Sequence, residues 1–104
     1  MIYLVIYDIS SDKIREKVAK KLVAEGFERL QLSVFSGIRS PKDNKAFWQV
    51  LVNLLQAEPS AKLYVLKVSI QNFRQMQIIG NHQIDYDYLT GQIDSLFFLS
   101  LIHM

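Results

Sequence analysis

The chain has 104 residues, a mass of 12.1 kDa and a formal net charge of +2, so it is the size of one domain and too small for two of ordinary size. Half of the residues are hydrophobic and 21% are charged, which excludes intrinsic disorder as the overall state. Because cysteine is absent, a disulfide scaffold, a thiolate zinc site and a cysteine nucleophile are excluded as well.

The first elements in chain order are a strand and a helix. Residues 2–7 are consecutive apolar residues rich in β-branched and aromatic types, which predicts a central strand buried on both faces. Residues 8–12 interrupt this run with N-cap candidates, and Gly26 is placed to end the helix that follows. The apolar face of that helix recurs at helical spacing through Ile14, Val18, Leu22 and Val23.

A second extended region and a second helix come next. Residues 28–39 predict either one long bent strand or two strands with a tight break near Ser33. Residues 40–43, Ser-Pro-Lys-Asp, predict the start of a helix, with the serine as its cap and the proline at the first helical position. The Glu-Pro pair at 58–59 ends this helix. Its apolar stripe consists of Phe47, Val50, Leu51, Leu54 and Leu55.

The last third of the chain is less regular. Residues 62–70 predict another strand, and residues 76–79 are a short apolar run closed by a glycine. Residues 81–94 are polar and loop-like, whereas residues 95–102 are a final apolar segment.

The resulting order of elements, βαββαβ, indicates a ferredoxin-like α+β sandwich. We expect this domain to cover residues 1–80 and a C-terminal tail to cover residues 81–104. Exposed to solvent, the apolar run at residues 96–99 would favour aggregation. We therefore expect the tail to form a strand that packs on the sheet of the second chain in a homodimer.

The sequence contains no segment typical of a membrane protein. Its longest stretch without a charge is residues 46–57, which is shorter than the ~18 residues that a membrane span needs. The first five residues have neither a basic region nor a cleavage site of the kind found in signal peptides. We expect a cytoplasmic protein with no membrane partner.

Positive charge is concentrated in the first half of the chain. Residues 13–45 carry a net charge of +5, whereas residues 1–12 carry −2 and residues 46–104 carry −1. The pattern fits a polyanionic partner, and it fits an ordinary solvated helix face about equally well. The basic residues of this half are Lys13, Arg15, Lys17, Lys20, Lys21, Arg29, Arg39, Lys42 and Lys45.

Few residues suggest catalysis by themselves. The two histidines, His82 and His103, are far apart and have no cysteine to complete a zinc site. Asp8 ends the central strand, a position where functional groups often collect in sheet proteins. From the pattern alone, a structural role of Asp8 at the turn or at the helix N-terminus is favoured over a functional one. Tyr7 points to the opposite face of the strand and is expected in the core.

Three segments resemble the CRISPR-associated Cas-two family over about the first 40 residues. The opening Tyr-Asp-Ile-Ser at residues 7–10 and the Gln-x-Ser-Val-Phe segment at residues 31–35 are specific when they occur together at this separation. The middle segment is Asp12-Lys13-x-Arg15-x-Lys17-Val18-Ala19-Lys20. The third begins with Gly26-Phe27-x-Arg29 and runs through the Gln-x-Ser-Val-Phe residues to Gly37. The later helix and strand match the family in pattern only.

The resemblance implies a ferredoxin-like homodimer that works in CRISPR spacer acquisition beside the Cas-one integrase. It also implies a metal-dependent endonuclease acting on RNA or on duplex DNA. Carried over by motif, Asp8 is the metal ligand and the functional tyrosine is Tyr7. The positions tied to activity also include Arg15, Arg29 and Phe35. The expected nucleic-acid contacts are Lys13, Arg15, Lys17, Lys20, Lys21 and Arg39.

One position departs from the family. Lys17 replaces an arginine of the first helix, and lysine keeps the charge but lacks the planar fork that binds a phosphate through two hydrogen bonds. For Phe35, simple packing in the sheet explains the residue as well as a role in catalysis does.

The implied cofactor is Mg²⁺ or another divalent cation. One carboxylate per chain makes a poor magnesium site, but two copies of Asp8 brought together by a two-fold axis would make a plausible one. Two other interpretations stay open. The protein could be a non-catalytic DNA-bridging scaffold of the integrase complex, or a toxin-type ribonuclease of the virulence-associated D family, which shares the fold.

Overall fold

The computed structural model describes residues 1–80 and 86–89. Within these residues the chain follows the expected βαββαβ order and then continues into two short helices. The elements are β1 (Ile2–Asp8), α1 (Asp12–Ala24), β2 (Glu28–Gln31), β3 (Val34–Gly37), a 3-10 turn η1 (Pro41–Asp43), α2 (Lys45–Gln56), β4 (Lys62–Val68), α3 (Ile70–Arg74) and α4 (Tyr86–Leu89). The predicted α+β class is confirmed.

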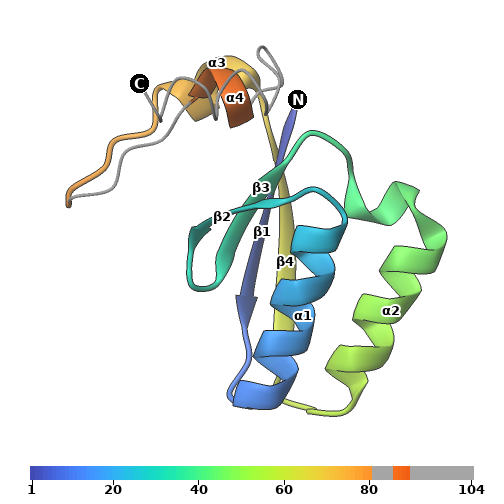
Figure 1. Ribbon diagram of the computed structural model, residues 1–104. Coiled ribbons are helices and arrows are strands. Elements are labelled where there is room, and N and C mark those ends of the chain that lie inside the picture. Colours follow the sequence, from blue (N-terminus) through green and yellow to red (C-terminus); the bar gives the residue numbers. More distant parts are fainter. Residues whose placement is uncertain (81–85, 90–104) are drawn as a thin grey trace, which may run out of the picture.

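The four strands form one antiparallel sheet in the order β2-β3-β1-β4. Strand β1 pairs with β3 on one side and with β4 on the other, so its central position is as predicted. The expected burial on both faces is not found, because Leu4 and Ile6 on the second face are only partly buried. Helices α1 and α2 both lie on the same side of this sheet (Figure 1). The molecule is therefore a two-layer sandwich with one covered face of the sheet.

The hydrophobic core lies between the sheet and the two helices. Val5 and Tyr7 of β1 and Phe35 of β3 point toward α1 and α2, because alternate residues of a strand share a face. The helices contribute Val18, Ala19 and Leu22 from α1 and Phe47 and Leu51 from α2. The periodicity of each helix thus predicted most of its buried face. Val23, which was expected on the apolar face of α1, is instead 56% exposed.

The opposite face of the sheet carries apolar side chains as well. Leu4 is paired with Leu66 and Ile6 with Tyr64, and these pairs share the face that points away from the two helices. Tyr64 is 55% exposed and Leu66 is 51% exposed. Strand β4, moreover, is an edge of the sheet. This face therefore presents large apolar side chains to solvent.

Both ends of α1 follow the sequence pattern. The Ser11 hydroxyl caps the helix by accepting a hydrogen bond from the Ile14 backbone N–H at 3.3 Å. At the other end Gly26 has a φ of +91°, in the left-handed region that favours glycine. The N–H of Gly26 donates to Val23 and the N–H of Phe27 donates to Leu22, which completes a Schellman motif.

Three expectations need correction or refinement. The predicted helix start at residues 40–43 is only the 3-10 turn η1, and α2 begins at Lys45. Asn44 separates the two because its backbone is extended, and its Oδ1 caps α2 by accepting from the Phe47 N–H at 3.2 Å. Residues 28–39 form two strands, the second of the two alternatives. Strand β4 stops at Val68 because Ser69 caps α3.

The tail is described only in part. Residues 86–89 form α4, where a loop was expected. The Tyr88 hydroxyl donates a hydrogen bond to Glu28 Oε1 at 2.9 Å, and this bond, with partial burial and the nearby carboxylate charge, raises the pKa of Tyr88. The predicted strand at residues 96–99, and with it the packing of the tail on a partner, lies outside the described residues. No helix in residues 1–80 and 86–89 is long and apolar enough to cross a membrane.

Gly37 allows a test of the packing between the sheet and the buried Phe27 ring. A Cβ atom added there would lie 2.6 Å from Cε2 of the buried Phe27 ring, closer than a van der Waals contact allows. We expect Gly37→Ala to lower the free energy of unfolding by about 1–3 kcal/mol, because the ring must move inside a packed core. Urea denaturation measures this, and a variant as stable as the native chain would contradict the packing described.

Candidate nucleic-acid and phosphodiester site

A groove with a volume of about 980 Å³ runs between the end of β1, one face of α1 and the turn that joins β2 to β3. It brings together five residues that the sequence analysis singled out from separate motifs. These are Tyr7, Asp8, Arg15, Lys20 and Arg29. The other candidate catalytic residue, Phe35, lies in the core next to the groove, with the Arg29 guanidinium 5.1 Å from the centre of its ring.

Asp8 is the last residue of β1 and is exposed. The antiparallel register places it directly opposite Lys62, the first residue of β4. Directly opposite residues point to the same face of a sheet, so a positive charge lies beside the candidate metal ligand. Lys62 was not a candidate from sequence, because only the strand register brings it to Asp8.

Tyr7 and Arg29 hold the turn between β2 and β3. The Tyr7 hydroxyl donates to the carbonyl oxygen of Leu32 at 2.9 Å, and Arg29 Nη2 donates to the same oxygen at 3.0 Å. The Tyr7 ring is 4% exposed and stacks on Phe35 with 6.0 Å between ring centroids. The core position expected for Tyr7 is confirmed, and its hydroxyl has a structural partner.

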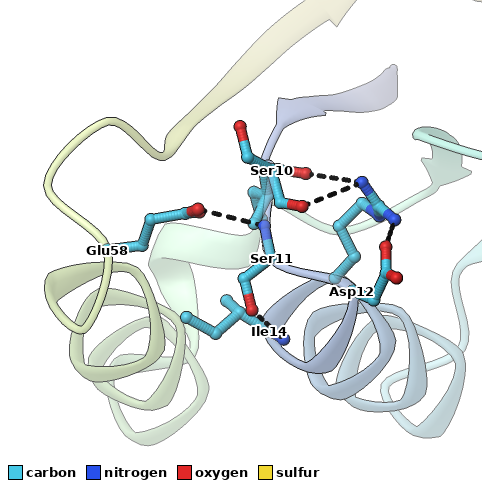
Figure 2. Close-up of polar contacts among 7 residues, drawn as sticks. Ser10, Ser11, Asp12, Ile14 and Glu58 are labelled. Atoms are coloured by element: carbon cyan, nitrogen blue, oxygen red, sulfur yellow. Dashed lines mark hydrogen bonds and ion pairs between the residues drawn. The ribbon is translucent and has the colours of Figure 1, made fainter.

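Arg15 holds the loop that follows Asp8. Its Nη1 donates to the carbonyl oxygens of Ile9 at 3.0 Å and Ser10 at 3.4 Å, and its Nη2 pairs with the carboxylate of Asp12 (Figure 2). A guanidinium has five N–H donors, so these contacts leave donors for a further acceptor. The arginine is thus fixed in place at the wall of the groove.

Glu58 reaches the same loop from the turn between α2 and β4. Its Oε1 accepts a hydrogen bond from the backbone N–H of Ser11 at 3.0 Å (Figure 2). The sequence indicated only that Glu58 ends a helix. No local pattern could have revealed the contact, because the two residues are 47 positions apart.

The basic residues of α1 divide into two sets. Lys20 lines the groove and pairs with Glu16 at 3.2 Å. The remaining candidates for nucleic-acid binding, Lys13, Lys17, Lys21 and Arg39, are exposed but do not line the groove. The groove itself also contains Asp8, Asp12 and Glu16, so its charge is mixed.

The described residues offer few ligands for a metal ion. Among residues 1–80 and 86–89 there is no group of three histidine, aspartate or glutamate side chains able to hold a metal. Asp8 is nonetheless exposed at a strand end, where a carboxylate from a second chain could approach it. Mg²⁺ commonly binds one or two protein carboxylates and keeps several waters, so the exposed Asp8 fits one ligand of such an ion.

Comparison with known proteins identifies the family. The family model described as "CRISPR associated protein Cas2" matches residues 1–76, which include strands β1 to β4 and helices α1 and α2. The chain belongs to the Cas2 family. This confirms the resemblance that the motifs of the first 40 residues indicated.

Two curated Cas2 relatives match shorter segments. The chain is 44% identical over 45 residues to the CRISPR-associated endoribonuclease Cas2 1 of Archaeoglobus fulgidus, covering 43% of this chain and 48% of that protein. It is 51% identical over 41 residues to the CRISPR-associated endoribonuclease Cas2 2 of Pyrobaculum aerophilum, covering 39% and 45%. The matched segments thus span about half the length of these relatives.

Solved structures share the fold over a larger part of the chain. Streptococcus pyogenes Cas2 superposes with a TM-score of 0.63 at 24% identity, covering 77% of this chain and all of that chain. A hypothetical protein of Thermus thermophilus has a TM-score of 0.63 at 27% identity, covering 80% and 94%. The four-stranded antiparallel sheet with two helices on one face is therefore the Cas2 fold.

The hydroxyl of Tyr7 gives a prediction that concerns structure alone. Tyr7→Phe keeps the stacked ring and removes the donor to Leu32, so the free energy of unfolding should fall by about 1 kcal/mol. Urea denaturation of both chains, with an unchanged m-value, measures the difference. An unchanged midpoint would show that the hydrogen bond adds nothing to the turn.

Proposed function

We propose that this chain is a homodimeric endonuclease of CRISPR spacer acquisition that hydrolyses phosphodiester bonds in RNA or duplex DNA and works beside the Cas-one integrase. The observation that carries the proposal is the groove, which places Asp8 with Arg15, Lys20 and Arg29. Fixed guanidinium groups can stabilise the charge of a reacting phosphate, and a carboxylate beside them can hold a divalent cation. The names of the two curated relatives add support.

Within this proposal, two copies of Asp8 hold the Mg²⁺ ion, which would supply charge stabilisation at the scissile phosphate and a more acidic water. Arg15 and Arg29 bind the phosphate with the N–H groups that their backbone contacts leave free. Because both guanidinium groups are already fixed by carbonyl oxygens, little side-chain entropy is lost when a phosphate binds.

The free face of the sheet supports the homodimer. Leu4, Ile6, Tyr64 and Leu66 form an apolar surface on the face that α1 and α2 leave uncovered, and β4 offers an open edge next to it. A second copy packed here would bury these side chains. It would also bring the strand ends that carry Asp8 toward the interface.

A second function is favoured by the same hydrogen bonds. Tyr7, Arg15 and Arg29 each donate to backbone carbonyl oxygens, as residues that shape a binding surface do. In that case the dimer is a scaffold that bridges DNA without cutting it, and Asp8 is structural. Membership of the Cas2 family favours both of these functions over a toxin of the virulence-associated D family.

Replacement of Asp8 separates the two functions. Asp8→Asn is nearly isosteric and removes the negative charge, so we expect cleavage and its Mg²⁺ dependence to fall at least a hundredfold while the oligomeric state is unchanged. The assay titrates Mg²⁺ on matched RNA and duplex DNA, with Asp43→Asn in η1 as the control. Cleavage equal to that of the native chain would contradict a metal role of Asp8, and a melting temperature many degrees lower would indicate a helix-entry role.

Binding of nucleic acid depends on salt in a way that tests the basic face of α1. If Lys20 and Lys21 contact phosphates, replacing both by alanine should flatten the slope of log affinity against log salt by about 0.9 for each lost contact. Lys67→Ala on β4, an exposed lysine outside the basic half, serves as the control. An unchanged slope in the double variant would mean that the two lysines are ordinary solvated surface.

A further inference from the structure

The loop between β1 and α1, residues 9–11, is held from two sides. Arg15 of α1 donates to the carbonyl oxygens of Ile9 and Ser10, and Glu58 accepts from the N–H of Ser11 (Figure 2). Arg15 belongs to the helix that the loop enters, whereas Glu58 comes from a different part of the chain. The backbone that follows Asp8 is therefore tied to the turn between α2 and β4.

Glu58 provides the capping-box carboxylate that α1 lacks in its own sequence. In a capping box, a Glu or Gln at the third helical position accepts the N–H of the N-cap residue. Here the N-cap is Ser11 and the third position is Ile14, which has no acceptor. Glu58 supplies the missing carboxylate, and its negative charge lies at the N-terminus of α1, where the helix dipole favours it.

Stability alone does not explain this glutamate. Its second oxygen, Oε2, is buried and has no hydrogen-bond partner among the described residues. A buried acceptor without a donor is unfavourable for folding, so a local rule is broken at this position. Such exceptions are expected where a residue serves a site.

The turn that carries Glu58 also reaches Asp8 by a second route. It leads into β4, whose first residue, Lys62, is paired with Asp8 in the sheet. Pairing with Lys62 in the sheet fixes Asp8, and the hydrogen bond to Glu58 fixes Ser11. Glu58 and Lys62 lie on either side of the rigid Pro59 in the chain. The geometry of the whole segment from residue 8 to residue 11 depends on this turn.

We infer that Glu58 is a positioning residue, which orients the Asp8 carboxylate by fixing the Ser11 backbone. The inference deepens the proposed function and rests on it for the role of Asp8. The feature that carries it is the hydrogen bond from Ser11 N to Glu58 Oε1 at 3.0 Å. For the position of the Ser11 backbone, the contribution of Glu58 is an acceptor oxygen at the right distance, whereas its charge adds only to the stability of α1.

Three substitutions separate reach from charge. Glu58→Gln loses the charge but keeps an oxygen at the same length, whereas Glu58→Asp keeps the charge on a side chain one methylene shorter. Glu58→Ala loses both. Gln56→Ala, at an exposed position at the end of α2 two residues before Glu58, is the matched control.

Two measurements on the full chain decide the outcome. Amide hydrogen exchange reports the Ser11 N–H directly, and titration with Mn²⁺ reports the affinity of the Asp8 site without any cleavage. We expect Glu58→Asp and Glu58→Ala to speed exchange at Ser11 at least tenfold relative to the interior of α1, and to weaken Mn²⁺ binding about tenfold. Glu58→Gln and Gln56→Ala should stay within twofold of the native chain in both.

The inference is overturned if Glu58→Asp and Glu58→Ala leave Mn²⁺ affinity within twofold of native, even with a lower melting temperature, since the glutamate is then only structural. It is also overturned if Glu58→Gln fails as badly as Glu58→Ala, because charge would then be the contribution. If the native chain binds no Mn²⁺, the proposed function and the orientation of Asp8 as a ligand are both refuted. The rate of hydrogen exchange at the Ser11 N–H then still shows whether the hydrogen bond to Glu58 exists.

Discussion

The alternation of side chains at the end of β1 is the constraint on which the other features depend. Tyr7 turns into the core, where it stacks on Phe35, and Asp8 consequently turns out to the surface. Pairing of β1 with both neighbours prevents a shift of one residue, which would bury the carboxylate and expose the ring. The core and the groove are therefore set by the same register.

The polar residues around the groove act first on the backbone of their own chain. Tyr7 and Arg29 converge on the carbonyl of Leu32, and Arg15 holds the loop after Asp8. A variant that lacks one of these side chains changes the shape of the groove as well as its charge. Loss of activity in such a variant would not by itself identify a catalytic residue, and stability has to be measured beside it.

The two faces of the sheet have different chemistry. One face is covered by α1 and α2 and borders the groove with its mixed charges, whereas the other presents Tyr64 and Leu66 to solvent. Apolar side chains on a free sheet face suit a second copy of the chain, and the lysines of α1 suit a polyanion. A dimer joined through the free face would keep both copies of α1 accessible.

The sequence by itself determined the features that arise from neighbours in the chain. The run at residues 2–7, the spacing of apolar residues in α1 and the position of Gly26 predicted the central strand, the buried helix face and the helix end. These features depend on local periodicity, caps and backbone preference. Asp8, Tyr7 and Arg15 became candidates mainly through the family resemblance, and the structure brings all three to one groove.

Tertiary structure decided what residues distant in sequence do to one another. Asn44, rather than Ser40, caps α2. The extended backbone of Asn44 separates the 3-10 turn from α2, and the Asn44 side chain also donates a hydrogen bond to Glu25. Lys62 comes to Asp8 only through strand register, and Glu58 comes to Ser11 only because α2 and β4 fold back onto the start of α1. A local sequence pattern cannot predict such contacts, because packing of the whole domain determines which distant residues meet.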